Sequence, residues 1–145
     1  MNEIEFYFEE TAAFSFHQKL LITKIKYLIN NEQGKVGPIT IVFCNDEYLL
    51  DINKQYLNHN YYTDIITFDY VEDNVISGDL FISIDRVKAN AKKYDVSFIR
   101  ELYRVVFHGV LHLVGYNDKT NEEQLLMTEK ENLYLAEVDF KGMEL

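Results

Sequence analysis

Residues 98–118 read FIRELYRVVFHGVLHLVGYND, and this stretch decides how the rest of the chain must be arranged. Apolar residues occupy nearly every side of a helix drawn through positions 98–114, which indicates a helix buried in the protein interior. Ser97 is suited to cap the start of that helix, and Gly115 is suited to the left-handed residue that follows its end. The sequence therefore predicts one central helix around which the other elements pack.

Two of the chain's four histidines lie in this helix. His108 and His112 are four residues apart, so both imidazoles project from one face, and Asp118 follows the Gly115 turn where the chain can fold back toward them. A lone buried histidine is usually a core residue, but two at this spacing with a third donor favour a zinc site with one open position. Iron(II) or another divalent metal is the alternative, because two histidines and one carboxylate also form an iron(II) facial triad.

The residue that follows the first histidine argues against a peptidase. Gly109 occupies the position at which the zincin pattern His-Glu-x-x-His carries its general base. The helix has the ligand spacing of a metallopeptidase but lacks the catalytic glutamate, so peptidase activity is disfavoured.

Residues 108–118, HGVLHLVGYND, resemble the signature His-Gly-x-Leu-His-Leu-x-Gly-Tyr-Asp-His of the YbeY family of metal-dependent single-strand endoribonucleases. Asn117 stands at the family's aspartate, and Asp118 stands at its third histidine. Residues 52–68, INKQYLNHNYYTDIITF, are similar to the family's Leu-Asn-x-x-Tyr-Arg-x-x-Asp-x-x-Thr-Asp-Val-Leu-Ser-Phe segment, and residues 77–83, SGDLFIS, to its Gly-Asp-Ile strand. The family's arginine is replaced by Leu57, so a guanidinium that could hold phosphate is missing there.

The resemblance implies a zinc-dependent, single-strand-specific endoribonuclease that acts in rRNA maturation, at the 3′ end of 16S rRNA, and in ribosome quality control. It implies single-stranded RNA, ribosomal RNA and small ribosomal subunit proteins as partners, with no DNA expected. Two alternatives stay open: a metal-dependent hydrolase of small phosphate esters or amides, and a non-catalytic ribosome-associated factor. The open coordination position favours an enzyme, because structural zinc normally has four protein ligands.

Three further residues are candidates for catalysis by a metal-assisted mechanism, in which a bound metal would polarise a phosphoryl oxygen and acidify a water molecule. Asp64 and Asp79, at the ends of two expected strands, could transfer protons or orient the ligand histidines. Arg104 precedes His108 by one helical turn and could clamp phosphate, although an ion pair with a strand carboxylate is the simpler interpretation. His59 could replace part of the missing arginine's function, although a solvated loop histidine is the simpler interpretation.

The charge of the chain is unevenly distributed. A net charge of −10 and a pI near 4.8 would repel polyanions at long range. Bases nevertheless outnumber acids between positions 85 and 104, where a basic stripe could track a single strand or simply be a solvated helix face. The basic residues there are Arg86, Lys88, Lys92, Lys93, Arg100 and Arg104. Possible stacking surfaces for unpaired bases are Tyr61, Tyr62, Phe68, Tyr70 and Tyr94, although most aromatic residues in such a chain belong to the core.

Composition favours one domain over residues 1–145, because 48% of the residues are apolar and no linker interrupts the chain. No apolar run is long enough to cross a bilayer, and the acidic N-terminus lacks the basic start of a secretory signal. The single Cys44 cannot form an internal disulfide and is interpreted as a small buried residue. A cytoplasmic protein without a membrane partner is the expectation.

Periodicity and turn residues predict a single α+β (α/β-like) domain. Its four-stranded sheet is mixed but mostly parallel, and about five helices surround it, one of them central and buried. Expected strands are 4–8, 38–43, 64–70 and 78–83, the last two antiparallel. Expected helices follow capping boxes at Ser15–Gln18 and Thr120–Glu123 and run to about Asn31 and Asp139, and the others are 45–57, 84–94 and 98–114.

Overall fold

A central helix, α4 (Phe98–Val114), organises the structure, a computed structural model that describes residues 3–143. Eleven of its seventeen residues are buried, as expected for a helix without a polar face. The Ser97 hydroxyl accepts a hydrogen bond from the backbone N–H of Arg100, and Gly115 closes the helix in the left-handed conformation with a φ of 115°. Both predicted helix ends are therefore confirmed.

Four strands form one sheet in the order β1-β2-β4-β3. β1 pairs parallel to β2 and β2 parallel to β4, whereas β3 pairs antiparallel to β4, so the sheet is mixed and mostly parallel as predicted. The strands are β1 (Ile4–Phe8), β2 (Lys35–Cys44), β3 (Ile65–Asp69) and β4 (Val75–Ser83). β3 is an edge strand, which leaves its outer side free to border a cavity.

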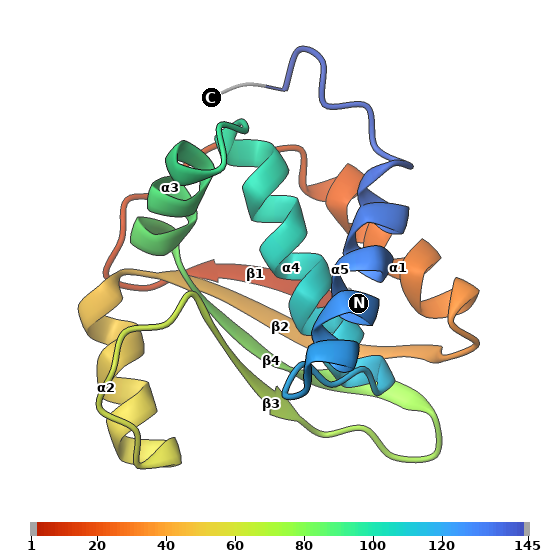
Figure 1. The fold of residues 1–145 in the computed structure, drawn as a ribbon, viewed down its shortest axis with the longest axis horizontal. Helices are drawn as coiled ribbons and strands as arrows, with labels where there is room; N and C mark the ends of the chain where they lie inside the picture. The colour runs from red at the N-terminus through yellow and green to blue at the C-terminus, as the bar shows by residue number, and fades with distance from the viewer. Residues whose placement is uncertain (1–2, 144–145) are drawn as a thin grey trace.

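The helices cover the two faces of this sheet unequally (Figure 1). Most of the core lies between one face and α4, which α1, α3 and α5 flank, while α2 covers the other face with a smaller apolar cluster around Cys44, Leu49 and Ile66. The helices besides α4 are α1 (Gln18–Asn31), α2 (Asp46–Leu57), α3 (Ile84–Lys93) and α5 (Asn121–Leu135). Side chains alternate along β4, so Leu80 and Ile82 face α4 whereas Phe81 faces α2.

Several element ends differ from the sequence prediction. The cap of α1 is His17, whose Nδ1 accepts from the backbone N–H of Leu20, and not the predicted Ser15. Strands β2 and β4 begin earlier than predicted, because Gly37 lets the chain lie against β4: a Cβ there would stand 2.5 Å from a Val75 methyl group. α5 ends at Leu135, short of the predicted Asp139. Periodicity locates an element better than it locates its ends.

Among residues 3–143, no helix combines the length and the apolar character needed to cross a membrane.

Candidate metal centre

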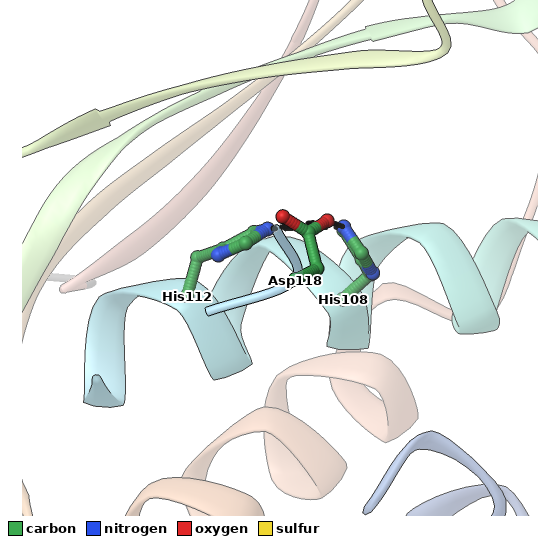
Figure 2. Close-up of side chains that lie close together, drawn as sticks. All are labelled: His108, His112 and Asp118. Carbon is green, nitrogen blue, oxygen red and sulfur yellow. Dashed lines mark hydrogen bonds and ion pairs between the residues drawn. The ribbon is translucent and has the colours of Figure 1, made fainter. Parts of the chain in front are cut away.

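Three donor atoms converge beside the second half of α4. Nε2 of His108 and Nε2 of His112 are 3.1 Å apart, and Oδ2 of Asp118 lies 3.2 Å from the first and 3.3 Å from the second. Figure 2 shows the two imidazoles and the carboxylate meeting above the helix, with Asp118 reaching them from the segment after α4. The structure thus brings together the three residues that the sequence predicts as metal ligands.

The spacing of these atoms fits a bound metal ion. Bonds of about 2.0–2.1 Å at tetrahedral angles place neighbouring ligand atoms about 3.3 Å apart, close to all three observed separations. The three atoms form one face of a tetrahedron. A fourth position would lie beyond that face, available to water or substrate.

Hydrogen bonds on the far side of each ring determine which nitrogen carries the proton. Nδ1 of His112 lies 2.8 Å from the carbonyl oxygen of Tyr116, which can only accept, so Nδ1 must donate. Nδ1 of His108 lies 2.6 Å from Oε2 of Glu131 and donates to that carboxylate. In the neutral rings both Nε2 atoms therefore present lone pairs to each other and to Asp118. A bound cation would relieve the repulsion among these lone pairs, so this group could bind a metal.

Glycine at position 109 lets α4 approach the sheet. A Cβ at Gly109 would lie 2.7 Å from Ile65 Cδ1 and 3.0 Å from the two Leu80 methyl groups. Any larger residue would push the helix away from β3 and β4. Position 109 therefore faces the sheet rather than the histidines, and a zincin-type glutamate would not fit there.

The segment after α4 is held by a polar network of its own. Tyr116, whose carbonyl orients His112, donates its hydroxyl proton to Oε1 of Glu32 at 2.6 Å. Oε2 of Glu32 accepts from Lys130 at 3.1 Å and from the hydroxyl of Tyr134. Burial raises the pKa of Glu32, but these hydrogen bonds and the Lys130 charge outweigh it and leave the pKa below its usual value. The network joins α1 and α5 to the turn that leads to Asp118.

A second network of charges lies behind His108. Arg104 contacts Glu101 at 2.6 Å, Glu131 at 3.2 Å and Asp64 at 3.8 Å, and Glu101 is almost fully buried. The hydrogen bond to Glu101 raises the pKa of Arg104, so its guanidinium stays charged. Burial lowers the pKa of His108, but the hydrogen bond to Glu131 and the nearby carboxylates raise it above its usual value in the metal-free protein. Arg104 therefore balances buried carboxylates around the site.

The triad borders a cavity of about 450 Å³. Its walls come from α2, α4, the edge strand β3, the loop between α2 and β3, and the segment that follows α4. Lining residues besides the triad are Asn53, Leu57, His59, Tyr61, Thr63, Asp64, Ile65, Ile66, Thr67, Asp69 and Asn117. Within residues 3–143 no lysine or arginine lines it, and the charged Arg104 lies behind the lining residue Asp64.

Of the three predicted catalytic residues, Asp64 and Arg104 lie near the triad, whereas Asp79 does not. Asp64 lines the metal cavity, and Arg104 lies behind it. The close ion pairs of Arg104 are with the helix carboxylates Glu101 and Glu131 rather than with the expected strand carboxylate, and Asp64, which precedes β3, is 3.8 Å away. Asp79 points to the opposite face of the sheet, where its Oδ2 accepts from the Tyr70 hydroxyl at 3.1 Å. The structure therefore does not bring Asp79 to the triad. The predicted lysine stripe on α3 does not line the cavity either.

Sequence reasoning missed Glu131, which orients His108. A signal was present: Met127, Glu131, Tyr134 and Leu135 form the buried stripe of α5, so a carboxylate stands where an apolar residue is expected. A buried carboxylate needs a partner, and Glu131 finds two on α4, Arg104 and His108. The pairing across two helices could not be read from spacing alone.

Comparisons with known proteins agree with this geometry. A family model described as Endoribonuclease YbeY matches residues 5–139. A protein named Endoribonuclease YbeY from Parabacteroides distasonis is 47% identical over 92% of this chain and 94% of its own length, and one from Flavobacterium johnsoniae is 45% identical over 89% and 94%. A solution structure of a Thermotoga maritima protein superposes with a TM-score of 0.65 at 28% identity, covering 92% of this chain and 87% of its own. The chain therefore belongs to the Endoribonuclease YbeY family.

Proposed function

We propose that this protein is a zinc-dependent endoribonuclease that cleaves single-stranded RNA in the cytoplasm, with ribosomal RNA, including the 3′ end of 16S rRNA, as its substrate. The observation that carries the proposal is the convergence of three lone-pair donors, His108, His112 and Asp118, at the wall of an open cavity. Relatives that match over most of this chain are named as endoribonucleases. Small ribosomal subunit proteins are the proposed protein partners.

The chain's own residues would prepare the site for reaction. A bound zinc ion would act as a Lewis acid on a phosphodiester oxygen and would lower the pKa of a water molecule. Tyr116 and Glu131 hold the two imidazoles so that both Nε2 atoms face the same point. Asp64 is the carboxylate outside the triad placed at the cavity wall closest to the Arg104 network, which makes it the candidate to hold a proton during cleavage.

The shape and charge of the cavity favour a single strand over a duplex. An unpaired strand can turn one phosphodiester into a cavity of about 450 Å³, whereas a duplex holds its backbone on a rigid cylinder. The net charge of −10 opposes long-range attraction of any nucleic acid. Binding should therefore depend on the metal and on contacts with bases more than on a basic surface.

Two alternatives are less well supported. A purely structural metal would normally have four protein ligands, whereas this group offers three beside an open cavity. The other alternative, hydrolysis of small phosphate esters, needs no long substrate channel, and assays with a small phosphate diester and with RNA distinguish the two activities. Iron(II) remains the alternative metal, because the same donors suit it.

The decisive experiment joins metal analysis to RNA cleavage. The purified protein should contain about one zinc per chain and should cut a labelled single-stranded RNA, with the matching duplex resistant. Addition of a chelator should stop cleavage, and zinc should restore it better than magnesium. Rapid hydrolysis of a small phosphate diester by protein that leaves RNA intact would replace this proposal by the small-ester alternative. Stoichiometric iron(II) that restores activity where zinc does not would change the proposed metal.

A further inference from the structure

Two stacked rings form part of the wall of the metal cavity. The imidazole of His59 and the phenol ring of Tyr61 have centroids 5.1 Å apart and planes inclined by only 21°. Nδ1 of His59 and the Tyr61 hydroxyl are 3.0 Å apart. Both residues line the same cavity as the metal triad, and the Tyr61 side chain is 55% exposed. A pair of stacked aromatic rings is thus accessible to a ligand that enters the cavity.

A buried asparagine holds this pair in place. Asn53, on α2, is only 1% exposed, and its carbonyl accepts a hydrogen bond from the His59 N–H at 3.0 Å. Its side-chain amide donates to the Tyr61 carbonyl at 2.9 Å. Asn58 ends α2 in the left-handed conformation and so turns the chain back toward Asn53. One fixed residue therefore fastens the backbone of both ring-bearing positions.

The charge of the cavity indicates what the pair can bind. Its ionised side chains outside the triad, Asp64 and Asp69, are acidic and would repel phosphate, and no lysine or arginine in the described chain lines it. A strand must therefore be held at this wall by contacts that do not depend on opposite charge. Stacking of a nucleobase on an aromatic ring is such a contact, and it tolerates any base because every base has a π-face.

We propose that the His59–Tyr61 pair is a stacking subsite for one unpaired nucleobase, which fixes the strand while an adjacent phosphodiester lies at the triad. The inference rests on the proposed function and deepens it, because it locates the contact that selects unpaired RNA. A base inside a duplex is covered on both faces by its neighbours and cannot use the subsite.

The neighbouring tyrosine provides a matched control. Tyr62 is 52% exposed, close to Tyr61 in both position and exposure, but its hydroxyl donates to Glu47 at 2.6 Å and it does not line the cavity. Loss of a general surface aromatic would affect both variants alike. Loss of a stacking subsite would affect Tyr61 alone.

The test uses a single-stranded RNA carrying 2-aminopurine, whose fluorescence falls when the base stacks. With metal-loaded protein, quenching is recorded by stopped flow before cleavage proceeds, and KM and kcat are measured on the same strand. Tyr61→Ala and Tyr61→Leu should weaken RNA binding at least about fivefold and raise KM, whereas Tyr61→Phe should bind normally. Tyr62→Ala should behave as the unchanged protein, and all variants should keep their metal.

The outcomes separate this inference from the proposed function. If the protein cuts RNA but Tyr61→Ala and Tyr62→Ala have equal KM values and equal quenching, the stacking subsite is wrong and the nuclease assignment stands. If quenching depends on Tyr61 but no RNA is cut, the subsite stands and the nuclease assignment fails. A Tyr61→Leu variant with full binding would also overturn the inference, because leucine fills space without a π-face.

Discussion

Two cavities beside the sheet are lined by carboxylates, but among the described residues only one of them contains converging metal donors. A cavity of about 450 Å³ at the edge strand β3, bordered by both α4 and α2, contains the converging donors of His108, His112 and Asp118. On the α2 face, a larger cavity of about 580 Å³ contains Asp51 and Asp79 among aromatic rings, and no histidine within residues 3–143 lines it. The comparison teaches that converging lone pairs, and not the volume of a cavity, locate a metal site.

Strand register explains why the two predicted strand carboxylates separate. Asp79 stands opposite Phe68 of β3 and Thr40 of β2, whereas its neighbours Gly78 and Leu80 contact α4. Because alternate residues of a strand point to opposite faces, Asp79 must point toward α2. Asp64 precedes β3 and lines the cavity on the α4 side.

The largest expected difference between the faces concerns metal content. His112→Ala should reduce bound zinc from about one per chain to nearly none, because two donors cannot hold the ion tightly. Asp79→Asn, on the other face, should keep the full amount. Atomic absorption of both purified variants checks this, and stoichiometric zinc retained in His112→Ala would show that the ligands lie elsewhere.

Replacement of Arg104, which pairs with buried carboxylates, should destabilise the protein more than replacement of Arg86, which lies nearer the surface. Arg104→Met should lower the free energy of unfolding by about 3 kcal/mol, because Glu101 would be left buried without its partner. Arg86→Met should cost at most about 1 kcal/mol, because Arg86 pairs with Asp46 near the surface. Urea unfolding of metal-free protein measures both values, and equal losses would contradict the role given to the buried network.

Removal of the carboxylate that orients His108 should have a smaller effect on metal binding. Glu131→Gln keeps the shape of the side chain but removes its charge, and the zinc affinity should fall about 10- to 100-fold. Glu129→Gln, at an exposed position of the same helix, is the control and should leave the affinity unchanged. Competition with a chromophoric chelator gives both constants. An unchanged affinity in Glu131→Gln would mean that the ring is oriented by packing alone.

The smallest effect is a change in pH dependence. Because the pKa of His108 is raised in the metal-free fold, its contribution to stability is fully present below its unfolded pKa of about 6.5. That contribution is lost as the pH rises through the folded pKa, whereas zinc affinity should increase over the same window because the ligand must be deprotonated. The free energy of unfolding, measured at several pH values in the presence of chelator, should fall as the pH rises through this window. His108→Gln should reduce that fall.

Local patterns predicted that His108, His112 and Asp118 lie together, because these three residues are close in sequence. The positions of His108 and His112 follow from helical periodicity, and Asp118 follows from the Gly115 turn. The contacts that orient these donors come from distant segments, with Glu131 on α5 and, behind Tyr116, Glu32 at the end of α1. Such pairings depend on how helices dock, which one-dimensional periodicity does not contain. The same limit applies to Asp79, whose face depends on register.

The hydrogen bond between His108 and Glu131 also affects when, during synthesis, the chain can bind metal tightly. A growing chain that has reached Asp118 already contains all three donor atoms, but α5, which supplies Glu131, has not yet been made. Until α5 docks on α4, the His108 ring lacks the partner that turns its Nε2 toward the other donors. We expect a nascent chain to bind metal weakly and to gain full affinity only after this helix is added. We therefore expect nuclease activity to appear only after α5 has docked on α4.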